Sequence, residues 1–235
     1  MNKDKLKTLL LTLLMSGLMS AGAAEKVIED HFEARGSGRH AGSPLNGTST
    51  EVGNVEWRTA PANEAGIVFT DRGSVTTGSN KSMGASVPIP DGAKEIRLEA
   101  DVRVNETGWV GLAFGGEPLD AQFFSPKGAY VFAILRPGGI YSAFANASSQ
   151  TLLCQSTLRG KMPTAFTHIE VIYKISEDRL TVRMDDKPVL EELSLGEKGY
   201  VPGPVLRAGF RFNGPPVVAG SPEVKNFKLT IVGEK

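Results

Sequence analysis

The sequence has very little of three things that often reveal function: cysteine, histidine and an excess of one charge. Lys and Arg together number 26 and Asp and Glu also number 26, so the net charge is zero, which argues against a partner such as nucleic acid or an anionic membrane surface. The single cysteine, Cys154, excludes an internal disulfide and a cysteine-built zinc site, and we expect it to be a buried, inert thiol. The three histidines, His31, His40 and His168, do not have the spacing of a metal site.

Long apolar runs are also missing, and the one short run predicts export. The run over residues 9–19 spans only 11 positions and is interrupted by Thr12, Ser16 and Gly17, against the roughly 20 apolar residues that a membrane-spanning helix needs. Lys3, Lys5 and Lys7 precede this run, and small residues follow it up to Ala24, which is the arrangement of a secretory signal peptide rather than of an uncleaved anchor. We therefore expect residues 1–24 to be cleaved and residues 25–235 to form one secreted or periplasmic domain that does not insert into a membrane.

The mature chain lacks the spacing of apolar residues that is typical of a long helix. Its apolar and polar residues instead alternate with a period of two. In residues 95–104, apolar and charged side chains alternate along the whole segment, which indicates a strand with one buried face. Residues 168–193 read as three strands joined by tight turns. Further strands are expected at residues 66–70, 82–89, 108–115, 129–135, 139–145, 150–156, 205–213 and 225–232, the last pairing with the first strand near 27–32. Residues 35–50 are expected to form a surface loop. The prediction is an all-β domain, a sandwich of two antiparallel sheets.

Several segments have the spacing of a known superfamily. They are Asp30-His31-Phe32, residues 45–48 leading to 51–53 and Trp57, residues 100–104, 108–114 and 180–186, and residues 224–227. This pattern resembles the concanavalin A-like lectin/glucanase superfamily in its bacterial laminin-G-like form, which implies a jelly roll. The resemblance implies an exported, non-catalytic domain that binds carbohydrate, as a polysaccharide or another glycan, or another cell-surface ligand. Two alternatives stay open: a glycoside hydrolase or polysaccharide lyase of the same fold, and a structural or adhesion domain of the cell envelope.

Catalysis in the hydrolases of this superfamily uses carboxylates clustered on one strand. The nearest equivalent here is Glu99 with Asp101 and a displaced Glu106, on a strand that also carries Arg97 and Arg103. Opposite charges that alternate along one strand face are typical of a solvated sheet surface. We interpret these residues as surface groups and name no catalytic residue.

Sugar binding on such folds uses aromatic faces together with planar polar side chains. Alternation predicts that Tyr130 and Phe132 share one sheet face, with their neighbours in the core. The candidate ligand-binding residues are Trp109, Tyr130, Arg136, Tyr141, Arg211 and Asn213. The alternative is that these aromatic residues pack in the core or are covered by loops.

The resemblance also implies a structural Ca²⁺ between the first and last strands. Asp30 occupies the opening position of such a site, and Asn226 stands where an Asp is common, which reduces the charge available to the ion.

Overall fold

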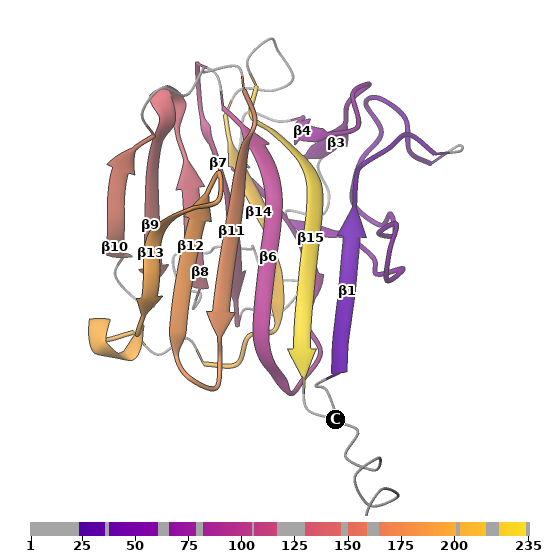
Figure 1. The fold of residues 1–235 in the computed structure, drawn as a ribbon. Helices are drawn as coiled ribbons and strands as arrows, with labels where there is room; N and C mark the ends of the chain where they lie inside the picture. Colours follow the sequence, from indigo (N-terminus) through magenta and orange to yellow (C-terminus); the bar gives the residue numbers. More distant parts are fainter. Residues whose placement is uncertain are drawn as a thin grey trace, which may run out of the picture.

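The computed structural model confirms the all-β sandwich. It describes residues 24–35, 38–60, 66–78, 82–104, 106–116, 130–146, 150–158, 165–200, 203–214 and 221–233. These residues form fifteen strands in two antiparallel sheets that face each other (Figure 1). Their only helical elements are two short 3₁₀ turns, η1 (Pro137–Gly139) and η2 (Gly196–Lys198). Within the described ranges, no helix has the length and hydropathy needed to cross a membrane.

The first sheet has eight strands, and the first and last strands of the chain meet in it. Its order is β13-β12-β11-β6-β15-β4-β3, with β1 paired to β15 as well. The bounds are β1 (Ala24–Asp30), β3 (Ile67–Phe69), β4 (Val75–Thr77), β6 (Ala93–Arg103), β11 (Thr167–Lys174), β12 (Arg179–Met184), β13 (Lys187–Leu193) and β15 (Glu223–Gly233). The meander expected over 168–193 is β11-β12-β13, and the predicted pairing of the first and last strands is confirmed by the β1–β15 register.

The second sheet has seven strands and lies behind the first in Figure 1. Its order is β10-β9-β8-β7-β14-β5-β2. The bounds are β2 (Arg58–Ala60), β5 (Met83–Pro88), β7 (Trp109–Gly115), β8 (Tyr130–Leu135), β9 (Ile140–Asn146), β10 (Gln150–Thr157) and β14 (Arg207–Asn213). The expected strand at 66–70 is β3, whereas β4, a strand of three residues, was not predicted, because so short a segment shows little alternation.

The main hydrophobic core lies between the sheets. Alternate residues of each strand point into it, as Ile96, Leu98, Ala100 and Val102 of β6 do, all fully buried. Its aromatic centre brings together side chains from distant parts of the chain, and Trp57 lies 4.7 Å from Phe227 and 5.4 Å from Phe210 between ring centroids.

The segment expected as a surface loop, residues 35–50, is partly internal. Leu45 is fully buried in the main core, and Arg39 is 8% exposed. The backbone of this segment pairs with β3, because the Leu45 N–H donates to the Ile67 carbonyl at 2.9 Å. The Gly- and Ser-rich composition favoured a solvated loop, because composition carries no information about contacts with residues distant in the sequence.

The predicted signal peptide, residues 1–24, lies outside the described residues except for Ala24. β1 begins at Ala24, next to the expected cleavage position. The division into residues 1–24 and 25–235 stays a prediction.

Candidate functional site

The outer face of the seven-stranded sheet, which points away from the main core, carries a second apolar cluster. Ala113, Tyr130, Phe132 and Ile134 are its buried members, and Trp109 and Phe144 pack against it while half-buried. The Trp109 and Phe132 ring centroids lie 5.4 Å apart in an edge-to-face arrangement, and those of Tyr130 and Phe132 lie 6.3 Å apart. The cluster exists because alternate residues of β7 and β8 are apolar on both faces.

Gly111 lets the cluster pack closely on the sheet. A Cβ atom at this position would collide with the Phe132 ring and with the carbonyl oxygen of Ala133. Because glycine has no side chain, the Phe132 ring can pack directly against strand β7 at Gly111.

Two arginines lie beside these aromatic rings. Arg211 on β14 holds its guanidinium 5.8 Å from the Trp109 ring centroid, and its Nε donates to Ser82 Oγ at 2.7 Å. Arg136 directly follows β8, lies 5.7 Å from the Phe144 ring centroid and donates from Nη1 to Ser142 Oγ at 2.6 Å. Burial lowers the pKa of Arg136.

Strand register places these groups at one end of the face. Asn213 on β14 is the register partner of Trp109 on β7, and Arg136 follows Leu135, the register partner of Val110. β7 lies between β14, which carries Arg211, and β8, which Arg136 directly follows, so Trp109 has an arginine on each side. Asn213 is exposed and the other members are half-buried. We call this set the aromatic–arginine patch: Trp109, Arg136, Phe144, Arg211 and Asn213.

The structure brings most of the predicted binding residues together on this face. Trp109, Arg136, Arg211 and Asn213 are members of the patch. Tyr130 shares the face, but only 4% of it is exposed, so its ring is not an open platform. Tyr141 packs against the main core instead. Sequence reasoning missed Phe144, although its alternation with the core residues Ala143 and Ala145 was a usable signal.

Charge is distributed very unequally between the two sheets. The strands of the seven-stranded sheet contain no Asp, Glu or Lys, and their only charged residues are Arg58, Arg207 and Arg211. The strands of the eight-stranded sheet contain ten acidic and ten basic residues. The balanced total charge of the chain therefore conceals one sheet whose described strands carry only positive charge.

Glu99 and Asp101, the carboxylates closest to a hydrolase pattern, lie on the eight-stranded sheet. Asp101 is hydrogen-bonded to His168 Nδ1 at 2.9 Å and accepts from Asn226 Nδ2 at 2.7 Å. Glu99 has Glu170 and Lys228 as register partners. Both residues alternate with core positions of β6, as expected of an outward-facing strand surface.

The side chains expected to bind Ca²⁺ instead form hydrogen bonds with other protein groups. Asp30 is fully buried, and its carboxylate accepts from Arg39 at 2.8 and 2.7 Å, from Trp57 Nε1 at 2.8 Å and from the Phe32 N–H at 2.9 Å. The Arg39 guanidinium already supplies the positive charge at this carboxylate. Because the Asn226 side chain is bonded to Asp101, Asp30 and Asn226 do not fit the expected metal site. The described part of the chain has no cluster of three or more His, Cys, Asp or Glu residues suited to a metal.

Comparison with known proteins finds similarity in structure alone, since no family model and no curated protein matches the chain. The carbohydrate recognition domain of Emp47p shares 16% identity and a TM-score of 0.56, over 93% of this chain and 100% of that one. The CBM2 module of the evolved Dit of Lactobacillus casei BL23 phage J-1 shares 12% identity and a TM-score of 0.56, over 92% and 99%. Winged bean acidic lectin, complexed with methyl-α-D-galactose, shares 10% identity and a TM-score of 0.56, over 90% and 100%. The fold is that of the concanavalin A-like lectins.

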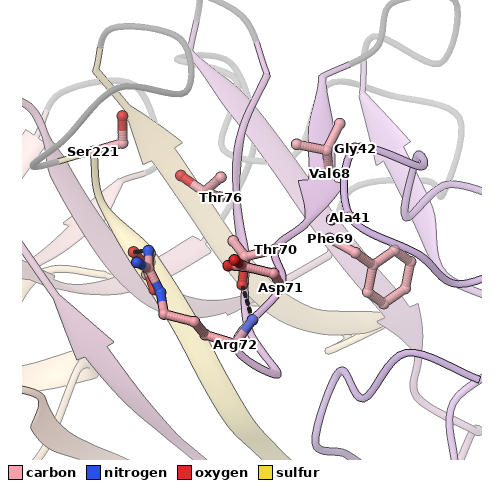
Figure 2. A pocket seen from close by; sticks show the side chains of 10 residues that line it. Ala41, Gly42, Val68, Phe69, Thr70, Asp71, Arg72, Thr76 and Ser221 are labelled. Atoms are coloured by element: carbon pink, nitrogen blue, oxygen red, sulfur yellow. Dashed lines mark hydrogen bonds and ion pairs between the residues drawn. The ribbon is translucent and has the colours of Figure 1, made fainter.

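This lectin fold also holds a small cavity of about 220 Å³ at the edge where β3 and β4 pair. Figure 2 shows it between Val68 and Phe69, the turn at 70–72, Thr76 and Ser221. At its margin, Glu223 accepts from Arg72 at 2.7 Å, from Ser74 Oγ at 2.9 Å and from Arg103. These contacts neutralise Glu223 and tie the β3–β4 turn to β15.

A shallow depression of about 530 Å³ lies on the loop that the lectin fold inserts between β1 and β2. Glu51 at its wall is hydrogen-bonded to His31 Nδ1 at 3.0 Å and ion-paired with Arg35 at 3.3 Å and Arg39 at 3.5 Å. Burial alone would raise the pKa of Glu51. The hydrogen bonds from His31 and from the Glu33 N–H, with the charge of Arg35, outweigh burial and lower that pKa.

We expect this network to make stability fall in acid. A carboxylate whose pKa is lowered by folding contributes stability above its unfolded pKa and loses it as the pH falls through the folded pKa. Thermal unfolding should therefore show a Tm that declines below the ordinary glutamate pKa of 4.5. Glu51→Gln should flatten this decline, whereas Glu25→Gln, at an exposed position of β1, should leave it unchanged. Identical acid profiles for the two variants would contradict the assignment.

Proposed function

We propose that this chain is an exported, non-catalytic domain that binds carbohydrate at the aromatic–arginine patch. Residues 1–24 would direct export, and residues 25–235 would form the binding domain. The observation that carries the proposal is the half-buried Trp109 ring, flanked by planar polar side chains on neighbouring strands. A sugar presents C–H groups that stack on an aromatic face and hydroxyl groups that bond to planar polar groups at its edge.

A binding role is favoured over hydrolysis by the placement of the carboxylates. Glycosidases generally need two carboxyl groups about 5–10 Å apart across the scissile bond. The described strands that form the patch carry no carboxylate, and Glu99 and Asp101 belong to the other sheet. The fold itself serves both enzymes and binding modules, so it does not decide between them.

Replacing Trp109 by alanine should weaken glycan binding about 2- to 10-fold without unfolding the domain. Aromatic stacking contributes roughly 0.5–1.5 kcal/mol, and 1.4 kcal/mol corresponds to a factor of ten in affinity. The exported protein, whose mass also reports signal cleavage, would first be screened for binding and hydrolysis on a polysaccharide panel. The bound polysaccharide would then be titrated calorimetrically with each variant.

Phe166→Ala is the matched control for the loss of an aromatic ring. Phe166 is half-buried beside the eight-stranded sheet, where Arg103 and Lys225 lie 4.7 and 4.3 Å from its ring centroid. The Phe166→Ala variant should leave glycan binding unchanged. A folded Trp109→Ala variant with wild-type affinity would move the site elsewhere. If the wild-type protein binds no glycan, a structural or adhesion role becomes the better account.

A further inference from the structure

Among the residues that the structure describes, Arg136 is a half-buried cation with no carboxylate partner. Its guanidinium donates to the Ser142 hydroxyl and faces the Phe144 ring, and burial lowers its pKa, but no Asp or Glu of the described chain forms an ion pair with it. Two other arginines shielded from solvent behave differently, because Arg39 is paired with Asp30 and Arg103 with Glu223. Taking a charge out of water without a counter-charge is costly, so an anion at Arg136 would be stabilised.

The surroundings of Arg136 reinforce this preference. Arg211 holds its guanidinium near the Trp109 ring on the same face, and the described strands of this sheet contain no acidic residue. Ser142, which receives the Arg136 hydrogen bond, is fully buried, so the guanidinium is held against the sheet. A surface where positive charge prevails raises the local concentration of anions and favours their binding.

We infer that the ligand of the aromatic–arginine patch is an acidic glycan, one that carries carboxylate or sulfate groups. This inference rests on the proposed function and specifies its ligand class. Trp109 stacks against a sugar ring, and the guanidinium groups of Arg136 and Arg211 bind the anionic substituents. Arginine suits this role because its planar, permanently charged fork matches the oxygens of a carboxylate or sulfate.

The test compares acidic and neutral polysaccharides as ligands of the intact mature domain. Polygalacturonate and its fully methyl-esterified form share one backbone and differ in charge, and dextran sulfate and dextran provide the same contrast for sulfate. Alginate and hyaluronate extend the acidic set, and galactan and laminarin extend the neutral one. We expect an acidic member to bind at least 10-fold more tightly than the neutral polymers, with an affinity that falls as NaCl is raised.

Variants of Arg136 then test the assigned residue. Arg136→Gln should weaken binding of the preferred acidic polymer about 10- to 100-fold, the range expected for losing a charged hydrogen-bonding partner. Arg136→Lys should restore part of that affinity, because it keeps the charge but loses the fork. Arg97→Gln removes the same charge from the other sheet, where Arg183 still pairs with Glu170 at 2.9 Å, and should have little effect. Far-UV circular dichroism and Tm would confirm that each variant is folded.

The outcomes separate the inference from the function on which it rests. Equal or tighter binding of neutral polymers would overturn the acidic specificity and leave a carbohydrate-binding domain. Equal losses in Arg136→Gln and Arg97→Gln would show a diffuse charge effect and overturn the assignment to the patch. Binding of no polymer in either set would count against both proposals. Preference for polygalacturonate or for dextran sulfate would identify the anionic group.

Discussion

Replacing Asp30 by asparagine should lower the free energy of unfolding by about 3–5 kcal/mol, the usual cost of removing one partner of a buried ion pair. Asp30 is fully buried, and the side chain of its partner Arg39 is only 9% exposed. Asparagine keeps the size of the side chain but leaves the guanidinium without its counter-charge. It also replaces one acceptor oxygen by an NH₂ group, so the donors from Arg39, Trp57 and the Phe32 N–H cannot all be satisfied.

Chemical denaturation of Asp30→Asn and wild type measures this loss directly. The matched control is Asp101→Asn, because the Asp101–His168 pair is partly solvated and such pairs contribute only about 0–1 kcal/mol. Trp57→Phe keeps a large aromatic ring while removing the indole N–H, and it should cost less than Asp30→Asn. A loss below 1 kcal/mol for Asp30→Asn would mean that the Asp30–Arg39 pair is not what stabilises this end of the sandwich.

Replacing Phe210 by alanine should lower the free energy of unfolding by a similar amount, about 3–5 kcal/mol, as expected for a large buried side chain that leaves a cavity. Phe210 on β14 is fully buried. Its ring centroid lies 6.0 Å from that of Phe32, 5.4 Å from Trp57 and 6.2 Å from Phe227, so one ring joins residues from both ends of the chain. Its loss removes contacts with several elements at once.

The control for Phe210→Ala is Leu152→Ala on the edge strand β10. Leu152 is 52% exposed, so its truncation removes little buried surface and should change stability by less than about 1 kcal/mol. Thermal unfolding of the two variants should therefore differ by several degrees. Equal Tm values would contradict the placement of Phe210 at the centre of the aromatic core.

Cys154 was expected to be a buried, inert thiol, but it is only half-buried, packed against the main core from strand β10. Burial still raises the pKa of its thiol, which keeps the thiol protonated near neutral pH.

Much of the fold could be predicted because period-two alternation is a local property. Residues 95–104 show which side chains enter the core without knowledge of the neighbouring strand, and the same rule correctly placed Tyr130 and Phe132 on the face opposite Val131 and Ala133. The short strand β4 was not predicted, because three residues show little alternation and its place in the sheet depends on the strands with which it pairs.

The candidate site was less predictable, because accessibility depends on contacts between distant residues. Trp109 and Tyr130 are both outward-facing aromatic residues, yet one is half-buried and the other 4% exposed. Tyr141 shares a strand with Phe144 but packs on the opposite side of the sheet. No local pattern separates these cases, since each depends on which strand and loop residues pack nearby.

The amino-acid sequence by itself determined the class of fold, the faces of the long strands and the absence of disulfides. Only the tertiary structure decided that Asp30 is paired with Arg39, that the described strands of the seven-stranded sheet carry arginines and no acidic residue, and that no carboxylate of the described residues pairs with Arg136. The physical reason is that alternation acts between residues two positions apart. Charge pairing depends instead on strand order and register, which bring together residues as distant as Glu223 and Arg72.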